Sequence, residues 1–233
     1  MKVSIITPCL NSARTIQKTI ESVLHQTYKD IEYIVVDGGS TDGTLSIIQE
    51  YIPKFQGRLK YVSGPDRGIY DAMNKGIRMS HGNVIGIINS DDFYEENAID
   101  NIVTHMSNGK HQMIYGYCRT INNGHFGCIW RRHHQNLPQV VIPHPTCFVT
   151  RDVYQEFGLF LNGFKVASDY EFILRLYVSN KVEFIQVKEI IANFRIGGMS
   201  SNSRLLKRER AIILYHYRMI PFKDLIKGFI YFG

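Results

Sequence analysis

Carboxylate side chains follow two apolar segments of this chain directly. The run Ile31–Val36 stops at Asp37. The run Val84–Ile88 stops at Asn89-Ser90-Asp91-Asp92. A buried strand that ends in acids delivers them to one edge of a sheet, where open α/β sheets bind their ligands. Hard cations such as Mg²⁺ and Mn²⁺ prefer carboxylate oxygens together with diphosphate oxygens and water. The two endings therefore predict a site for a polar, hydroxyl-rich ligand chelated by a divalent cation.

Each ending also has a purely structural interpretation. Asp37 precedes two glycines, and Asp often caps a turn. Asp91 and Asp92 suit the first turn of a helix, because the helix dipole favours anions there. Two acid-tipped strands in one sheet favour the functional interpretation.

A third acid, Asp169, lies in the segment Ser168-Asp169-Tyr170-Glu171. Ser168 and Glu171 match a capping box, so we expect Ser168 to cap a helix and Glu171 to reach back to it. This leaves Asp169 free in the first turn. A helix N-terminus stabilises an ionised carboxylate and lowers its basicity, so location alone does not identify a base. The position suits a reaction in which the nucleophile loses its proton late. His144, held between two prolines, is a further candidate for substrate contact, although a lone histidine is more often structural.

The elements that must hold these acids alternate between strands and helices in the first half of the chain. Apolar residues at helical spacing separate short apolar runs. This alternation predicts an α/β fold with a mostly parallel central sheet flanked by helices. We expect strands over Val3–Thr7, Ile31–Val36, Leu59–Val62 and Val84–Ile88.

The helices between these strands need N-terminal caps. Asn11 or Ser12 is expected to cap the first helix, and Ser40 or Thr41 the second. Pro8 is expected to close the first strand.

Beyond about residue 110 the rhythm changes. Gln112–Cys118 and Phe126–Arg132 read as a hairpin around Asn122-Asn123-Gly124. A strand near Cys147–Val149 and a helix near Asp152–Phe157 follow. No linker or repeat separates the halves, so this smaller mixed β/α half is expected to fold onto the first.

Composition limits the classes of protein. The 233 residues suit one domain, or one domain with a tail, and the net charge of +6 favours anionic partners. Four scattered cysteines without C-x-x-C spacing predict free thiols in a reducing compartment and no zinc site. No apolar stretch approaches the roughly 20 residues that span a bilayer, and the N-terminus is strand-like. We therefore expect a cytoplasmic protein.

The segment 211–233 mixes basic residues with aromatic and aliphatic residues at helical spacing. It suits either a helix that packs on the domain or a helix that lies on a membrane surface. Near an anionic leaflet each basic residue contributes about 1 kcal/mol, so three or four would hold the protein there reversibly.

Together these segments resemble family 2 glycosyltransferases of the GT-A (Rossmann-like) fold, over nearly the whole chain. The opening Val3-Ser4-Ile5-Ile6-Thr7-Pro8 with Asn11, the two acid-tipped segments and Ser168–Glu171 with Arg175 follow the family's order. The segment Asp66–Ile77 looks like the subgroup that assembles bacterial surface polysaccharides and O-antigens.

The resemblance implies a role for each matching residue. Thr7, Pro8 and Asn11 would line the nucleotide pocket. Asp37 would accept a hydrogen bond from the base, typically uracil, and Asp66 and Asn74 would complete that wall. Asp91 would approach the ribose or the metal, and Asp92 would bind the divalent cation (Mn²⁺ or Mg²⁺). Asp169 would be the general base in a single inverting displacement at the anomeric carbon. His144 and Arg195 would lie on the acceptor or diphosphate side.

Four positions depart from the family pattern. Asn89 stands where many relatives carry Asp, which leaves one acid fewer at the metal. Met73 replaces a common arginine, and Ser168 replaces the Glu of the Glu-Asp motif. Arg195-Ile196-Gly197-Gly198-Met199-Ser200 stands where many members show Arg-x-His.

The resemblance thus implies an inverting glycosyltransferase, with its nucleotide half at about 1–110, its acceptor half at about 111–210 and a basic tail at 211–233. It would move a sugar from a nucleotide-diphosphate sugar, UDP-linked, to a hydroxyl of a glycan or lipid-diphosphate-linked acceptor in O-antigen or capsule synthesis. Nucleic acid is not an expected partner; an anionic membrane surface, through the tail on the cytoplasmic face of the inner membrane, is one. The alternative is a non-catalytic module that binds a nucleotide sugar or a polyanion. A Rossmann oxidoreductase is disfavoured, because Pro8-Cys9-Leu10-Asn11 follows the first strand where G-x-G-x-x-G would be needed.

Overall fold

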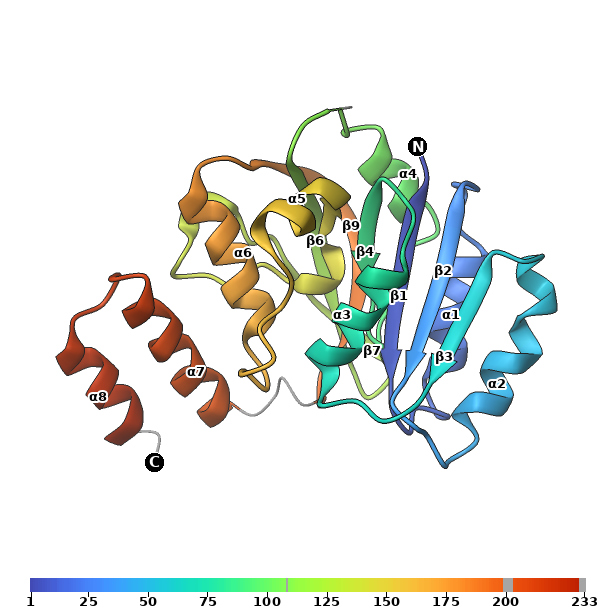
Figure 1. The fold of residues 1–233 in the computed structure, drawn as a ribbon, viewed down its shortest axis with the longest axis horizontal. Coiled ribbons are helices and arrows are strands. Elements are labelled where there is room, and N and C mark those ends of the chain that lie inside the picture. The colour runs from blue at the N-terminus through green and yellow to red at the C-terminus, as the bar shows by residue number, and fades with distance from the viewer. Residues whose placement is uncertain (108, 199–202, 231–233) are drawn as a thin grey trace.

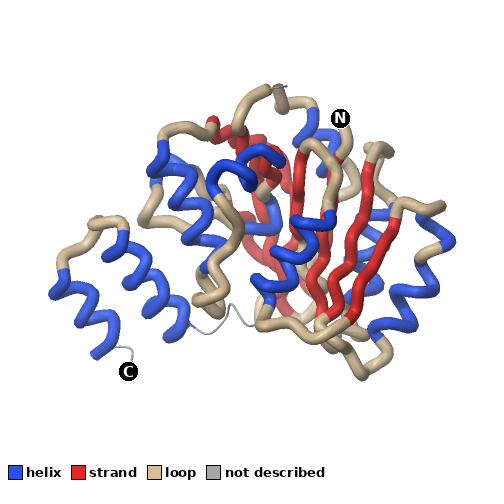
Figure 2. Tube along the Cα trace, viewed as in Figure 1, coloured by secondary structure: helices blue, strands red, loops and turns tan. Residues whose placement is uncertain are grey.

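A nine-stranded sheet with helices on both faces forms the body of the protein (Figures 1 and 2). The structure is a computed structural model that describes residues 1–107, 109–198 and 203–230, with the side chains of 203 and 227–230 left out. Met199 and Ser200 of the late loop, and the side chains of Lys227, Phe229 and Ile230 in the tail, lie outside the described residues.

Figure 1 labels most of the strands and helices, and its colours follow their order along the chain. The strands are β1 (Val3–Cys9), β2 (Ile31–Asp37), β3 (Leu59–Ser63), β4 (Val84–Ile87), β5 (Phe93–Tyr94), β6 (Gln112–Asn122), β7 (His125–Trp130), β8 (Phe148–Thr150) and β9 (Glu183–Arg195). The α-helices are α1 (Ile16–Leu24), α2 (Thr44–Tyr51), α3 (Ile69–Met79), α4 (Ala98–Val103), α5 (Arg151–Phe157), α6 (Ser168–Ser179), α7 (Ser203–His216) and α8 (Phe222–Ile230). Short 3₁₀ turns lie at Pro53–Phe55, His134–Asn136 and His144–Thr146.

The sheet is mostly parallel, as the sequence predicts. Its strand order is β3-β2-β1-β4-β8-β6-β9-β5, with β7 paired to β6. Strands β1 to β4, β6 and β9 run in one direction, and β5, β7 and β8 run against them. Alternating β and α elements produce the parallel half, and the hairpin-rich second half supplies the antiparallel strands.

The register of the parallel strands brings their acidic ends to one edge. Cys9 lies beside Asp37, and Asp37 lies beside Ser63. The pairing of β1 with β4 stops at Ile6 and Ile87, so the chain after β4 leaves the sheet at the same edge. The carboxyl ends of β1, β2, β3 and β4 therefore share one edge, where ligands of such sheets bind.

Two apolar clusters cover the two faces of the sheet, because neighbouring side chains of a strand point to opposite faces. Ile6 of β1 belongs to the cluster under α3, α5, α6 and α7. Ile5 belongs to the cluster under α1, α2 and α4. Helix α3 approaches β1 closely: a Cβ atom at Gly76 would lie 2.4 Å from Ile6 Cγ2. This contact requires glycine and fixes the helix that follows Asp66 against the sheet.

The predicted hairpin is present and uses a two-residue turn. Asn122 pairs with His125, and Asn123 and Gly124 have φ values of +48° and +82°. Positive φ at both central positions is the signature of a type I′ turn, which Asn-Gly adopts at little cost.

The predicted caps of the first two helices are wrong. Helix α1 begins after Thr15, not after Asn11 or Ser12, and α2 begins after Gly43. The side chain of Asn11 instead accepts a hydrogen bond from Thr41 N at 2.9 Å. Near α2, Asp42 Oδ1 accepts from Thr44 N at 3.1 Å. Asn11 therefore joins two loops, and the N-caps of the two helices are Thr15 and Gly43.

Strand β1 also runs two residues further than predicted, through Pro8 to Cys9. Pro8 has no N–H group to donate to a neighbouring strand. It is tolerated because β4 no longer pairs with β1 at this position, so that β2 is the strand still paired there. The sequence did not predict α4, β5 or β9.

Helix α7 crosses residue 210, so the predicted boundary between domain and tail falls inside a helix. Ile213 is 1% exposed in the main apolar cluster. Helix α8 packs beside α7, with the rings of Tyr215 and Phe222 5.8 Å apart. The first part of the tail thus packs on the domain. In the part of the chain that the structure describes, no helix is both long and apolar enough to cross a membrane.

Candidate active site

The segment after β4 holds a carboxylate, Asp92, that is almost completely buried. Asp92 is 1% exposed. Its Oδ1 accepts a hydrogen bond from Arg195 N at 2.9 Å, which ties the end of β9 to this segment. Its Oδ2 is buried and accepts no hydrogen bond from the described residues, and neither does Asn89 Oδ1. Most buried polar atoms in folded proteins have a hydrogen-bond partner, so an open carboxylate oxygen is available to a ligand or an ion.

The surroundings of Asp91 and Asp92 disfavour the ionised form of both carboxyl groups. Burial raises the pKa of Asp92 well above its usual range, and the neighbouring Asp91 raises it further. Burial also raises the pKa of Asp91. Arg195 partly offsets both effects. A divalent cation would favour the ionised forms of both groups.

The donor set fits a hard cation in part. Asp91, Asp92 and the Asn89 amide offer oxygen ligands, and two of those oxygens are buried with no hydrogen-bond partner among the described residues. However, no group of three or more His, Cys, Asp or Glu side chains within residues 1–107, 109–198 and 203–230 could hold a metal by itself. A bound substrate and water would have to complete the coordination, as is usual for Mg²⁺.

The carboxylate at the end of β2, Asp37, is hydrogen-bonded through both of its oxygens. Asp37 is also 1% exposed. Its Oδ2 accepts from Gly39 N at 3.1 Å, Ser40 N at 3.0 Å and Ser63 Oγ at 2.6 Å. Its Oδ1 accepts from Ser40 Oγ and from Cys9 Sγ. Burial raises the pKa of Asp37, but the hydrogen bonds from Ser40, Ser63 and Gly39 outweigh burial and lower it overall.

The other residues expected at the nucleotide pocket lie around this loop. Thr7 is fully buried and accepts from Tyr33 OH at 3.0 Å, and Pro8 is buried beside it. Asn11 is exposed and joined to the Ser40 loop through its backbone N–H, which donates to Ser40 Oγ at 2.7 Å. Ser12 Oγ lies 2.8 Å from Ser90 Oγ. The loops after β1, β2 and β4 therefore form one connected rim.

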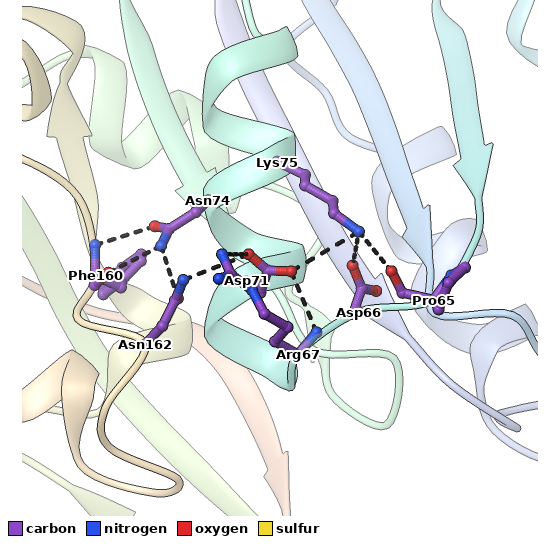
Figure 3. A network of polar contacts seen from close by, with 8 residues as sticks. All are labelled: Pro65, Asp66, Arg67, Asp71, Asn74, Lys75, Phe160 and Asn162. Atoms are coloured by element: carbon purple, nitrogen blue, oxygen red, sulfur yellow. Dashed lines mark hydrogen bonds and ion pairs between the residues drawn. The ribbon is translucent and has the colours of Figure 1, made fainter.

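Asp66 adjoins this rim from the loop before α3. A Cβ atom at Gly38 would lie 3.1 Å from Asp66 Oδ2, which places Asp66 beside the Asp37 loop. Lys75 Nζ donates to Asp66 Oδ1 and, at 2.9 Å, to Pro65 O (Figure 3). The same ammonium lies 3.9 Å from Asp71 Oδ2. Lys75 thus holds the Asp66 loop onto α3.

Asn74 points the other way from α3, toward the loop after α5 (Figure 3). Its Nδ2 donates to Phe160 O at 2.8 Å and to Asn162 Oδ1 at 3.2 Å, and its Oδ1 accepts from Phe160 N at 3.0 Å. The side-chain amide is therefore engaged within the protein. A contact between Asn74 and the nucleotide, which the resemblance implies, remains a prediction and would require these bonds to change.

Asp169 lies in the first turn of α6, half-buried. Tyr70 OH, from α3, donates to Asp169 Oδ1 at 3.0 Å. His144 is buried, with its ring edge-on to Phe160 at 5.5 Å between centroids. Burial lowers the pKa of His144, and the Asp169 carboxylate opposes that shift. The structure thus brings Asp169, His144 and Tyr70 together.

The predicted capping box is absent. Ala167 is the N-cap of α6, and Ser168 is the first helical residue, with its buried Oγ unpartnered among the described residues. Glu171 accepts from Arg175 Nη2 and from Tyr217 OH, both at 2.8 Å. Interactions with Tyr217, which directly follows α7, and with the next turn of α6 therefore replace the local cap.

Two residues at the site escaped the sequence analysis. Tyr70 lies in the segment Asp66–Ile77, which carries part of the family resemblance. Its position next to the apolar stripe of α3 is the feature that could have pointed to it. Lys18 places its ammonium 3.7 Å from the centroid of the Phe93 ring, and Arg195 lies over the same ring at 5.9 Å. Burial lowers the pKa of Lys18, and Arg195 lowers it further. Nothing in the sequence around Lys18 distinguishes it from an ordinary surface lysine.

The fold has relatives among solved structures. The chain superposes on the mannosyltransferase PcManGT from Pyrobaculum calidifontis, solved with GDP-Man and Mn²⁺, with a TM-score of 0.74 and 16% identity over 99% of this chain and 69% of that one. It superposes on S. aureus TarS 1–349, solved with UDP-GlcNAc, with a TM-score of 0.70 and 20% identity over 92% of this chain and 66% of that one. The fold with its acidic carboxyl edge is that of a GT-A glycosyltransferase.

Sequence comparison identifies the family. Glycosyl transferase family 2 matches residues 4–204. A PGL/p-HBAD biosynthesis glycosyltransferase of Mycobacterium bovis is 29% identical over 218 residues, which cover 88% of this chain and 82% of that protein. The chondroitin synthase of Escherichia coli is 40% identical over 98 residues, which cover 42% of this chain and 14% of that protein. The chain belongs to glycosyl transferase family 2, and it is a glycosyltransferase.

Proposed function

We propose that this protein is an inverting glycosyltransferase that moves a sugar from a UDP-sugar to a hydroxyl group of a glycan or lipid-linked acceptor. The observation that carries this proposal is the half-buried Asp169 carboxylate, held by the Tyr70 hydroxyl beside a buried histidine. It stands in the first turn of α6, in the half of the chain that we propose binds the acceptor.

The chemical step is a direct displacement. The acceptor oxygen forms a bond to the anomeric carbon while the bond from that carbon to the diphosphate breaks, and the diphosphate leaves with the electron pair. Asp169 takes the hydroxyl proton, and a positioned base of this kind contributes roughly 10²–10⁴-fold to the rate. Tyr70 donates to Oδ1 and so leaves Oδ2 for the proton. Neutral His144, whose pKa burial lowers, can orient the acceptor hydroxyl without adding charge.

The donor would lie along the rim formed by the loops after β1, β2 and β4. Thr7, Pro8, Asn11, Asp37, Asp66 and Asn74 are proposed around the nucleoside. Asp91 and Asp92 would hold Mn²⁺ or Mg²⁺, which when bound neutralises charge on the leaving diphosphate. Arg195, whose backbone N–H holds Asp92, would serve the diphosphate side. The TarS structures with UDP and UDP-GlcNAc support a uridine donor, while PcManGT, solved with GDP-Man, has the same fold with a guanosine donor.

Two experiments test the proposal. UDP should bind more tightly with Mn²⁺ than with EDTA in calorimetry; equal affinity would remove the metal from the proposal. Asp169→Asn should lower sugar transfer by about 10²–10⁴-fold while leaving UDP affinity nearly intact. Asp152→Asn is the matched control, because Asp152 lies in the first turn of α5. Full turnover by Asp169→Asn would exclude Asp169 as the base, and no turnover by the wild type with any nucleotide sugar would favour the binding-module alternative.

We further propose that the acceptor belongs to surface-polysaccharide synthesis, O-antigen or capsule, and that the protein works at the cytoplasmic face of the inner membrane. Helix α8 supports this placement, because Phe222 and Ile226 are 58% and 40% exposed there. Lys223, also exposed, lies between them in sequence. Such a helix suits the surface of an anionic bilayer. Phe222→Ser with Ile226→Ser should release the protein from anionic vesicles in a sedimentation assay; unchanged binding would exclude α8 as the anchor.

A further inference from the structure

The start of α6, the helix that carries Asp169, has no cap within its own segment. Its N-cap is Ala167, which has no side-chain oxygen, and the Ser168 hydroxyl accepts nothing from the described residues. Val166, Ala167 and Ser168 are 8%, 0% and 0% exposed, so water cannot readily satisfy their backbone N–H groups. Buried N–H groups of this kind need an acceptor from elsewhere in the fold.

Glu209 of α7 provides that acceptor. Its Oε1 accepts from Lys165 N at 2.8 Å, and its Oε2 accepts from both Val166 N and Ala167 N at 2.9 Å. Glu209 is 7% exposed, so these charge-assisted bonds form largely out of water. In a capping box a Glu three residues into the helix reaches back to the N–H of the N-cap. Here a residue more than forty positions away in sequence occupies that role.

The next residue of α7, Arg210, contacts Tyr170, which follows Asp169 in the chain. Arg210 Nη2 donates to Pro138 O and to Gln139 O, both at 3.2 Å. Its guanidinium lies 4.9 Å from the centroid of the Tyr170 ring. Glu209 and Arg210 therefore fix the residues immediately before and after the pair Ser168-Asp169.

We propose that Glu209 is a positioning residue for the transfer reaction: it fixes the first turn of α6 and thereby the place of the Asp169 carboxylate. This inference rests on the proposed role of Asp169 as the base. A loose first turn would let the carboxylate drift from the acceptor hydroxyl, and a displacement of about 1 Å in such a group can cost about 10²-fold in rate. Donor binding, which belongs to the rim on the other side of α3, would be unaffected.

Variants at position 209 test this role. Glu209→Gln keeps one acceptor oxygen and turns an amide toward the remaining N–H, so kcat should fall about tenfold; Glu209→Ala removes every bond, and kcat should fall about 100-fold. Calorimetry should give a Kd for UDP with Mn²⁺ within about twofold of the wild type. Hydrogen exchange in a peptide covering 165–172 should be faster in both variants. The rate is measured as UDP release from the donor sugar that the wild type uses.

Glu171→Gln is the matched control. Glu171 is 4% exposed on the same helix, and its side chain bonds to Arg175 and to Tyr217, which directly follows α7. Unlike Glu209, its side chain accepts no bond from the backbone N–H groups of residues 165–167. This variant should lower Tm as much as Glu209→Gln does, yet keep kcat within about threefold of the wild type. Equal losses of kcat in the two Gln variants, or unchanged kcat in Glu209→Gln, would overturn the positioning role. Glu209→Gln carries the test if Glu209→Ala does not fold. Failure of the underlying proposal is separate, because it appears as retained turnover in Asp169→Asn.

Discussion

Asp37 and Asp92 end neighbouring parts of the same sheet edge, and each is 1% exposed, yet their surroundings differ in every other respect. Asp37 accepts five hydrogen bonds from its own loop, from β1 and from β3. Asp92 accepts one through Oδ1, and its Oδ2 has no partner among the described residues. The pKa of Asp37 is lowered even though burial works to raise it, whereas at Asp92 burial outweighs the lowering effects of Arg195 and Asn89 and the pKa is raised.

This difference separates a carboxylate that holds structure from one that is available to a ligand. A carboxylate has about four lone-pair sites, and the five donors around Asp37 occupy them. For Asp37 to accept a hydrogen bond from the nucleotide base, the base would have to replace the hydroxyl of Ser40 or Ser63 as donor. Both hydroxyl groups can rotate away. Asp92 keeps an oxygen open at a cost in stability, which is common for residues kept for function.

The largest effect is expected at Asp92. Asp92→Asn should reduce sugar transfer by about 100-fold or more, because the substitution removes a ligand charge from the proposed cation site. The affinity of UDP should also become the same with Mn²⁺ and with EDTA. Rate assays and calorimetry measure the two quantities, with Asp100→Asn on α4 as the control. Metal-dependent UDP binding that survives in Asp92→Asn would show that the two strand ends do not differ as proposed.

Asp37→Asn should act mainly on stability. The carboxamide keeps one acceptor oxygen and turns an N–H₂ group toward the donors of Gly39 and Ser40. Losing buried hydrogen bonds to a charged group should lower the free energy of unfolding by about 2 kcal/mol. Urea denaturation measures this, and Asp30→Asn is the control, since Asp30 lies at the opposite end of β2 with its side chain 58% exposed. A loss at Asp37 no larger than that at Asp30 would contradict the structural role.

The parts of this comparison that are local in sequence were predictable. An apolar run that ends at Asp37 or at Asn89 indicates where a strand leaves the sheet, and Asn123-Gly124 fixes its hairpin turn without help from the rest of the fold. The family resemblance rests on the same short segments. The fold class followed, because alternation of strands and helices leaves few other topologies.

The parts that depend on distant residues were not predictable. Ser168 and Glu171 have the spacing of a capping box, but Glu209 takes the role of Glu171 at the helix start from α7. The sequence of β9 lacks a clear alternation, because its burial depends on β6, which lies about seventy residues earlier in the chain. The condition of Asp92 likewise depends on Arg195 from the end of β9. Spacing rules contain none of these contacts.

A smaller effect is expected in the pH dependence of stability. The pKa of Asp92 in the folded protein lies above its unfolded value of 3.8, so its contribution to stability is present below pH 3.8 and is lost as pH rises through the folded pKa. Without metal, Asp92→Asn should therefore be more stable than the wild type at pH 7, by about 1 kcal/mol.

Asp37 has the opposite sign. Its lowered pKa means that its contribution is present above pH 3.8 and is lost as pH falls through the folded pKa. The free-energy difference between the wild type and each variant, followed by urea denaturation from well below pH 3.8 up to neutral pH, should therefore change in opposite directions for the two aspartates. Parallel changes would mean that the two carboxylates do not differ in hydrogen bonding as described.

The smallest effect is expected at Asn89, the position that leaves this edge one acid poorer. Its Oδ1 is buried and has no hydrogen-bond partner in the part of the chain that the structure describes. An aspartate there would place a third carboxylate beside Asp91 and Asp92. Three carboxylates repel one another without metal, and together they attract a cation more strongly than two do. Asn89→Asp should therefore lower the Mn²⁺ concentration for half-maximal thermal stabilisation by about threefold. Its metal-free Tm should fall at the same time. Asn83→Asp adds the same charge at the exposed opposite end of β4 and should change neither quantity. If both variants respond alike, general charge attracts the cation, and the open oxygen of Asp92 is not its ligand.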